Sequence, residues 1–157
     1  MGGGTGAPAR SVKIRPATEA DLPAILEIER ASFGDPWTER SFRAMLGHET
    51  VQLRVAERAG HILGYSVAWS VADEAEVANL AVAAPVRRQG IGTALLDDLL
   101  AVMDTRPGTT VYLEVRASNT AAQALYASRG FTAHGRRNAY YTAPLEDAVV
   151  MVRRRGD

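Results

Sequence analysis

The 157-residue sequence contains no cysteine, which excludes disulfide bridges, thiolate metal sites and a cysteine nucleophile. It has no apolar run of membrane-spanning length and no hydrophobic region of a signal peptide near its start. It also lacks an excess of either charge, because 18 basic residues balance 18 acidic ones. A balanced surface gives no support for nucleic acid or a membrane as the partner. We therefore expect a cytoplasmic protein that binds neither.

The sequence has few histidines and no arrangement of them that suits a metal ion. His48, His61 and His134 are scattered along the chain without the spacing typical of metal ligands. We assign them no role and expect no metal cofactor.

The remaining composition is that of one globular domain, with 46% hydrophobic residues to form a core. Residues 1–11 are rich in glycine and poorly suited to packing, so we expect a disordered leader or tag. A single domain is predicted over 12–153 and a polar tail over 154–157. The arginines near this end favour a solvated terminus over a nucleic-acid patch.

Hydrophobic periodicity predicts seven strands and four helices. The strands are expected at 12–15, 51–55, 62–69, 76–82, 109–115, 131–137 and 147–152. The helices are expected at 22–30, 38–46, from the glycine-rich turn near 90 to 103, and at 119–128. The early strands form hairpins and the later ones alternate with helices, so we expect an α/β fold with a mixed sheet and helices on both faces. The run EVANLAV at 76–82 is the most continuously apolar strand and is expected to be central.

Local signals mark several ends of these elements. Thr18–Asp21 resembles a capping box, with Asp in place of the usual Glu or Gln. Asn119 is a plausible N-cap of the last helix, and Gly130 is well placed as its C-terminal stop. Pro107–Gly108 is expected to break the chain between a helix and a strand.

The stretch VRRQGIGTALLDDLL, Val86–Leu100, combines a Gly-x-Gly turn with an amphipathic helix. A helix N-terminus offers unpaired N–H groups and a positive dipole end, which suit a phosphate. Gly90 and Gly92 would let a ligand approach the backbone, and Arg87 and Arg88 can add charge-assisted contacts. The pattern alone leaves a phosphate site and an ordinary helix start equally open.

Two common phosphate motifs do not fit this stretch. A dinucleotide-binding fingerprint needs a small residue where Leu95 stands, and it belongs near the start of a βαβ unit. A Walker P-loop needs a Gly-Lys-Ser/Thr sequence, which does not follow here.

The segment Arg87–Gly92, read as Arg/Gln-x-x-Gly-x-Gly, resembles the pyrophosphate-binding motif of the GNAT acetyltransferases. The resemblance implies the GNAT fold, a mostly antiparallel seven-stranded sheet flanked by about four helices, with acetyl-CoA as cosubstrate. It implies that main-chain N–H groups of Arg88–Thr93 hold the phosphates and that Leu80–Val82 pair with the pantetheine amides. The coenzyme-binding residues expected from it are Leu80, Ala81, Val82, Arg87, Arg88, Gln89, Gly90, Ile91, Gly92, Thr93 and Asn119.

Further motifs resemble the RimI-type branch of this family, the ribosomal-protein-alanine N-acetyltransferases. This branch acetylates the N-terminal alanine of a small-subunit ribosomal protein, so a protein N-terminus is the expected partner. The spacing between the arginine pair and the tyrosine pair is slightly stretched here. The matching segments are Asp35–Trp37, Leu113–Asn119, Ala124–Tyr126, Arg129–Phe131, Arg136–Tyr141 and Glu146–Ala148.

Glu114 is the candidate general base. An α-amine has a pKa of about 8 and must lose its proton before it attacks a thioester. Strand alternation places Glu114 on the face opposite Leu113 and Val115, in the middle of an apolar strand. The alternative is a structural ion pair with Arg116 or Arg137. The family resemblance favours the base role, acting through a water molecule.

Tyr126 is the candidate general acid. It lies two helical turns after Asn119 and hence on the same face of that helix. A phenol with a pKa of about 10 is protonated at neutral pH and can donate to a departing thiolate. The alternative is simple core packing. The resemblance implies a position near the coenzyme sulfur, and a main-chain N–H near Val82 is expected to polarise the thioester carbonyl.

Two loops are the candidates for binding the acceptor, because loops on a rigid scaffold often carry specificity. One is Phe33–Trp37 and the other lies between the last two strands. Their candidate residues are Trp37, Arg137, Tyr140 and Tyr141. The alternative for Trp37 is that it caps the core.

The leading hypothesis is an acetyl-CoA-dependent acetyltransferase for a protein N-terminus. One alternative is a GNAT enzyme for a lysine side chain or a small-molecule amine. The other is an acyl-CoA-binding module without activity, which would need neither Glu114 nor Tyr126. The sequence does not determine the oligomeric state.

Overall fold

The structure, a computed structural model, describes residues 11–103 and 108–154. The leader over 1–10, the break at Pro107 and the end of the tail, 155–157, lie outside the described residues. Seven strands are present in the described part: β1 (Lys13–Pro16), β2 (Val51–Arg58), β3 (His61–Val71), β4 (Glu74–Val82), β5 (Thr110–Arg116), β6 (Thr132–Tyr141) and β7 (Glu146–Arg154). The α-helices are α2 (Leu22–Ser32), α3 (Glu39–Met45), α4 (Ile91–Met103) and α5 (Thr120–Ser128), with short 3-10 turns at Glu19–Asp21 and Ala84–Val86.

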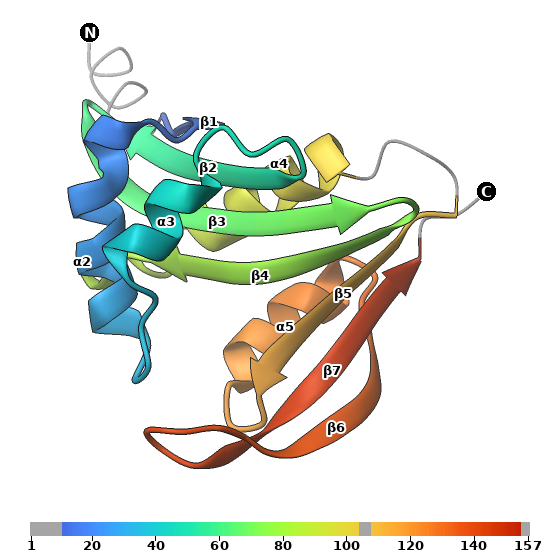
Figure 1. Cartoon of the computed structure of the whole chain (residues 1–157). Coiled ribbons are helices and arrows are strands. Elements are labelled where there is room, and N and C mark those ends of the chain that lie inside the picture. The colour runs from blue at the N-terminus through green and yellow to red at the C-terminus, as the bar shows by residue number, and fades with distance from the viewer. Residues whose placement is uncertain (1–10, 104–107, 155–157) are drawn as a thin grey trace, which may run out of the picture.

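The strands form one sheet in the order β1-β2-β3-β4-β5-β7-β6 (Figure 1). Among the described strands, β4 and β5 pair in parallel and every other neighbouring pair is antiparallel. The predicted mixed, mostly antiparallel seven-stranded sheet is therefore confirmed. The apolar strand β4 occupies the central place that its composition predicts.

Helices cover both faces of the sheet (Figure 1). On the face called here the front, α2 and α3 pack against β2 and β3 through a core that includes Ile25, Phe42 and Tyr65. On the back face, α4 and α5 pack against β4, β5 and β7 through a core that includes Leu99 and Leu113. Each helix buries the apolar stripe that its periodicity predicts.

Strand β4 leaves β5 after four paired positions, Glu74–Val77 against Thr110–Leu113. Beyond them β4 stays paired with β3, and β5 stays paired with β7. The extra residue Ala78 forms a bulge in β4 at this point, and a bulge bends its strand. The two strands therefore diverge (Figure 1). We call the opening between Asn79–Val82 and Glu114–Arg116 the fork.

The predicted caps are confirmed. The Thr18 N–H donates to Asp21 Oδ2 at 2.7 Å, and α2 begins directly afterwards at Leu22. Asn119 caps α5, because its Oδ1 accepts a hydrogen bond from the Ala122 N–H at 3.0 Å. Gly130 follows the end of α5 with a φ of 90°, a conformation that glycine adopts without steric cost.

One local prediction about the last hairpin is wrong. Tyr140 and Tyr141 lie in β6 and not in a loop. Arg137 pairs with Ala148 and Tyr141 pairs with Glu146. Residues 138–140 therefore oppose Asp147 alone and form an irregular bulge of three residues. Ala139, with a φ of 50°, donates its N–H to Asp147 Oδ1 at 2.8 Å. This bulge accommodates the stretched spacing seen in the sequence.

The last strand is also longer than the predicted 147–152. Strand β7 continues through Arg154, which pairs with Thr110 at the edge of β5. Arg153, in the same strand, donates its Nε hydrogen to the Arg129 carbonyl at 2.9 Å. The strand continues because backbone pairing with β5, a long-range contact, outweighs the polar composition of this end.

Candidate active site

A cleft of about 520 Å³ opens beside the fork. It is bounded by the end of α2, the end of β4, the beginning of α4 and the first half of α5. Nine of its lining residues belong to the coenzyme set or to the turn that the sequence singles out. The lining residues are Ser32, Phe33, Leu80, Ala81, Val82, Arg87, Arg88, Ile91, Gly92, Thr93, Asn119, Ala121, Ala122 and Leu125.

The N-terminus of α4 presents unpaired N–H groups at this cleft. The first helical hydrogen bond runs from Ala94 N–H to the Gly90 carbonyl, so the N–H groups of Ile91, Gly92 and Thr93 have no acceptor within the helix. Gly90 has a φ of 83°, which turns the chain from Arg88 into the helix. This end of the helix is therefore suited to an anionic ligand.

Two members of the predicted set do not line the cleft. Gln89 accepts a hydrogen bond from Arg58 Nη1 at 3.4 Å on the outside of the turn. Gly90 shapes the turn without lining the cleft. Both residues belong to the sequence motif, but the tight turn points them away from the cleft.

The end of β4 directs backbone groups into the fork. The Ala83 N–H donates to the Leu63 carbonyl of β3 at 2.8 Å. Because backbone groups alternate along an antiparallel pair, Ala81 is also bonded to β3, and the N–H and C=O groups of Leu80 and Val82 point the other way. The Val82 carbonyl accepts from Arg87 Nε at 3.0 Å. The Leu80 groups and the Val82 N–H therefore face the space left by β5.

Glu114 is the first residue of β5 beyond its pairing with β4, and it lies at the base of the fork. Its side chain is 15% exposed and its Oε2 lies 2.5 Å from Arg137 Nε. It also accepts a hydrogen bond from the Tyr140 hydroxyl, and this is the largest cause of the raised pKa of Tyr140. Glu114 shares the front face with Tyr112 and with Glu76, the register partner of Tyr112.

The ion-pair alternative for Glu114 holds for Arg137 and is wrong for Arg116. Arg116 binds Glu146 at 3.3 Å and the carbonyls of Pro144 and Thr142 at 2.9 and 3.1 Å. These contacts hold the turn after β6. Hydrogen bonds from Ser118, and then the contact with Arg116, lower the pKa of Glu146. Arg137, by contrast, is 61% exposed, so water can replace Glu114 as its partner at little cost.

Tyr126 lies on the other side of β5 from Glu114. Its ring packs in the back-face core, edge-on to Phe131 at 5.8 Å, and burial raises its pKa to about 12. Its hydroxyl makes no hydrogen bond within the described part of the chain. It is also not enclosed, since the enclosed side-chain atoms without partners there are the hydroxyls of Ser32 and Ser66. Tyr126 thus packs in the core with its hydroxyl not fully enclosed, and it does not belong to the cleft lining.

Aromatic side chains stand on both sides of the fork on the front face. Trp37 stacks on Trp69 of β3, with 6.1 Å between the ring centroids, and it packs against Phe42. It therefore also covers the core. The rings of Tyr140 and Tyr141 contact each other edge to face, with 5.0 Å between their centroids, and the Arg137 guanidinium lies over the Tyr140 ring. Burial is the main cause that raises the pKa of Tyr141 to about 12.

The two segments that carry these aromatics meet. Thr142 Oγ1 donates to Asp35 Oδ2 at 3.4 Å. A Cβ atom added at Gly34 would lie 1.9 Å from the Ala143 carbonyl oxygen, so only glycine allows this approach. Together the α2–α3 loop and the turn between β6 and β7 enclose the front side of the fork.

Residues that sequence reasoning did not single out complete this side. Glu29 is 1% exposed and accepts hydrogen bonds from the main-chain N–H of Trp37, from the Tyr65 hydroxyl and from Asn79 Nδ2. Glu76 accepts from Trp69 Nε1 at 3.2 Å. A signal for Glu29 was available, because it lies three or four residues after Leu26 and Ile25 on the apolar face of its helix.

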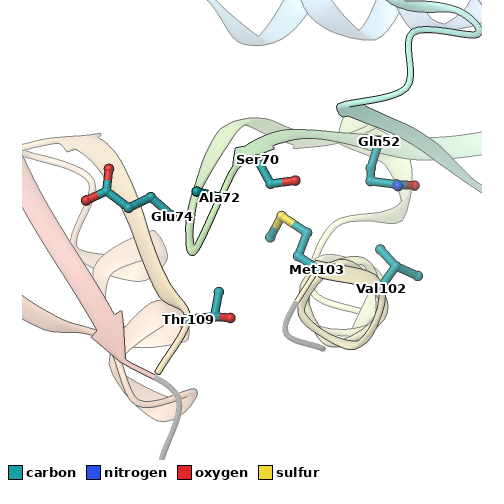
Figure 2. Close-up of a pocket in the computed structure, with 7 residues that line it drawn as sticks. All are labelled: Gln52, Ser70, Ala72, Glu74, Val102, Met103 and Thr109. Carbon is teal, nitrogen blue, oxygen red and sulfur yellow. The ribbon is translucent and has the colours of Figure 1, made fainter. Parts of the chain in front are cut away.

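A second, smaller cavity of about 150 Å³ lies at the far end of β3 and β4 (Figure 2). Figure 2 shows its lining between the β3–β4 turn and the end of α4, and Glu74 is the sole titratable group in that lining. It contains none of the predicted site residues. A single carboxylate without a partner group gives no basis for acid–base chemistry, so the cleft at the fork is the candidate active site.

Residues 11–103 and 108–154 contain no group of three or more histidine, aspartate or glutamate side chains that could hold a metal ion. No helix in these ranges is long and apolar enough to cross a membrane.

Comparison with known proteins gives consistent matches. The model of the acetyltransferase (GNAT) family matches residues 22–131. The chain is 39% identical over 133 residues to the [ribosomal protein bS18]-alanine N-acetyltransferase of Escherichia coli K12, covering 83% of this chain and 89% of that protein. It is 36% identical over 152 residues to N-alpha-acetyltransferase RimI of Mycobacterium tuberculosis, covering 93% and 94%. The crystal structure of the E. coli ribosomal-protein-S18-alanine N-acetyltransferase matches with a TM-score of 0.84 and 37% identity, covering 94% of this chain and 96% of that one.

Proposed function

The chain belongs to the acetyltransferase (GNAT) family, and on that basis we propose that it acetylates the N-terminal α-amine of a protein, using acetyl-CoA. The substrate we propose is the N-terminal alanine of a small-subunit ribosomal protein in the cytoplasm. The observation that carries the proposal is the position of Glu114 and Tyr126 on opposite faces of β5, beside a cleft that ends at an open helix N-terminus. The matches to enzymes named for this substrate support it.

The cleft residues hold the coenzyme in this proposal. The N–H groups of Ile91, Gly92 and Thr93 bind its phosphates, and Arg87 and Arg88 add positive charge at the same end. The backbone of Leu80 and Val82 pairs with the pantetheine amides, in the place that β5 leaves open. Asn119 lines the opposite wall. Acetyl-CoA supplies the thioester that the amine attacks.

The acceptor reaches the fork from the front face, between Trp37 and the tyrosines of β6. Glu114 takes a proton from the α-ammonium group through a water molecule, which leaves the neutral amine to attack the thioester carbonyl. The Val82 N–H stabilises negative charge on the carbonyl oxygen. The C–N bond forms, the C–S bond breaks, and Tyr126 gives a proton to the departing thiolate. The nitrogen releases its second proton to water, and water returns a proton to Tyr126. The products are the acetylated N-terminus and free CoA thiol.

Placing base and acid on opposite faces suits this reaction. The amine arrives from the front and the coenzyme lies in the cleft on the other side of the fork. Each proton is therefore transferred on the side of the fork where it is needed.

A peptide assay tests the proposal directly. A peptide that begins with alanine and carries the start of the ribosomal protein should release CoA thiol from acetyl-CoA. The same peptide with an acetylated N-terminus is the matched control and should give background release, because its amide nitrogen is not nucleophilic. Turnover with lysine side chains or polyamines but not with the free N-terminus would contradict the proposal, as would acetyl-CoA binding without turnover of any amine.

The pH dependence of kcat/KM is expected to have a rising limb and no fall up to about pH 10, the ordinary pKa of tyrosine. The α-amine becomes reactive as it loses its proton near pH 8. The phenol donates only in its protonated form, and the pKa of Tyr126 near 12 keeps it protonated throughout that range. Tyr126→Phe should lower kcat by about 100-fold or more. A profile that falls with a midpoint near 9, or a full rate in Tyr126→Phe, would exclude Tyr126 as the acid.

A further inference from the structure

Glu29 carries a buried carboxylate near the end of α2 that the proposed reaction does not use. Its Oε2 accepts the Trp37 N–H at 2.8 Å, and its Oε1 accepts Asn79 Nδ2 at 2.9 Å and the Tyr65 hydroxyl. The side chain forms no salt bridge within the described residues, although it is 1% exposed. Three neutral donors from three different segments therefore satisfy one carboxylate.

These donors belong to the parts of the molecule that meet at the fork. Trp37 is in the α2–α3 loop and stacks on Trp69. Asn79 follows the bulge in β4 and precedes Leu80, the first cleft residue of that strand. Tyr65 lies in β3, next to β4. Glu29 thus joins the acceptor loop to the strand that borders the coenzyme cleft.

Stability alone does not explain a carboxylate at this position. Burying a carboxylate has a large desolvation cost, and an apolar side chain of similar volume often stabilises a core equally well. A carboxylate differs from an apolar or amide side chain because it only accepts hydrogen bonds. It therefore fixes the direction of all three donors: the Trp37 N–H points inward, and the Asn79 amide turns its Nδ2 to Glu29 and its carbonyl away.

The donor character of Tyr65 is secure in this cluster. Burial, and then the neighbouring Glu29 carboxylate, raise the pKa of Tyr65 well above its usual value. The phenol stays protonated and donates to Glu29. All three donors reach Glu29, and the Tyr65 oxygen also accepts a hydrogen bond from Asn79, which links two of the donors to each other.

We propose that Glu29 is a positioning residue for the acceptor: its carboxylate holds the Trp37 loop and Asn79 in place on the front side of the fork. This inference rests on the proposed function, since it assigns the front side to the acceptor peptide. Its effect falls on peptide binding and leaves coenzyme binding nearly unchanged, because none of the three donors, Trp37, Tyr65 and Asn79, belongs to the cleft lining.

Glu29→Gln tests this, with Glu27→Gln as the matched control on the exposed side of the same helix. A glutamine keeps the volume but brings an N–H₂ group that faces donors. We expect the peptide KM to rise about tenfold or more, the effect of losing one hydrogen bond to a charged group. The dissociation constant for acetyl-CoA, measured by calorimetry, should stay within about twofold of the wild-type value.

Near-ultraviolet circular dichroism gives a readout that needs no substrate. Trp37 and Trp69 are the two tryptophans of the chain, and Trp37→Phe supplies the spectrum without their stacking. Glu29→Gln should shift toward that spectrum, and Glu27→Gln should match the wild type. A wild-type spectrum in Glu29→Gln, or equal losses of peptide and acetyl-CoA affinity, would overturn the inference.

Asn79→Ala decides the matter if Glu29→Gln does not fold, since Asn79 is only partly buried. The same rise in peptide KM with unchanged acetyl-CoA binding supports the inference, and wild-type kinetics overturn it. If the wild-type chain acetylates no peptide N-terminus, the proposed function fails. The dichroism comparison of Glu29→Gln, or of Asn79→Ala in its place, then still tests the anchoring of Trp37.

Discussion

Glu114→Gln is expected to lower kcat for peptide acetylation by about 100- to 10,000-fold, the usual contribution of a general base. The substitution keeps the shape of the side chain and removes its ability to accept the proton. Acetyl-CoA affinity should remain within about twofold of the wild-type value, because Glu114 lies outside the cleft lining. Steady-state kinetics together with calorimetry measure both quantities.

Stability should change little in this variant. The partner that it leaves, Arg137, is 61% exposed and can be solvated. Glu74→Gln is the matched control, since Glu74 is an exposed glutamate at the opposite end of β4. It should retain the wild-type rate. A Glu114→Gln rate above about half of wild type would mean that the carboxylate is a structural partner of Arg137 and Tyr140 and not the base.

Gly92→Val is expected to weaken acetyl-CoA binding by about 100-fold, which corresponds to losing one or two charge-assisted hydrogen bonds. A Cβ atom at this position meets Leu125 and Val82 at 3.7 Å and Leu80 at 3.8 Å, which are ordinary contacts. The Cβ atom itself is therefore accommodated, and the two methyl groups of valine occupy space among three residues that line the cleft. Calorimetric titration with acetyl-CoA measures the loss.

The same substitution at Gly135 is the control for a general effect of valine. Gly135 lies in β6, where an added Cβ atom has no neighbour within 4 Å, and it is not part of the cleft lining. Gly135→Val should bind acetyl-CoA like the wild type. Equal binding by Gly92→Val and the wild type would show that the phosphates do not approach the α4 backbone.

The structure distinguishes the two glycines of the α4 turn. The sequence motif contains Gly90 and Gly92 without distinguishing them. Gly90 has a φ of 83° and open space around its Cβ position, so a larger residue there strains the turn. Gly92 has ordinary backbone geometry and faces the cleft. Gly90 is therefore needed for the shape of the turn, and Gly92 is needed to leave room for the ligand in the cleft.

Local signals in the sequence determined where the helices and strands form. The Thr18–Asp21 box, the Asn119 cap and Gly130 act over a few residues, so their outcome depends little on the rest of the chain. The apolar composition of β4 likewise identified the central strand, because a strand buried on both faces needs apolar residues at successive positions. The resemblance of the motifs to a family pointed to nine of the fourteen cleft residues and to the candidates Glu114 and Tyr126, whose roles stay predictions.

Only the tertiary structure decided how these residues meet. The choice of Arg137 over Arg116 as the partner of Glu114 depends on β6 lying at the sheet edge and on where its bulge falls. The hydrogen bonds of Glu29 join residues up to 50 positions apart. The fork itself exists because β4 and β5 follow different neighbours after four paired positions. Such pairings depend on sheet order and on long-range packing, which local propensity and spacing do not encode.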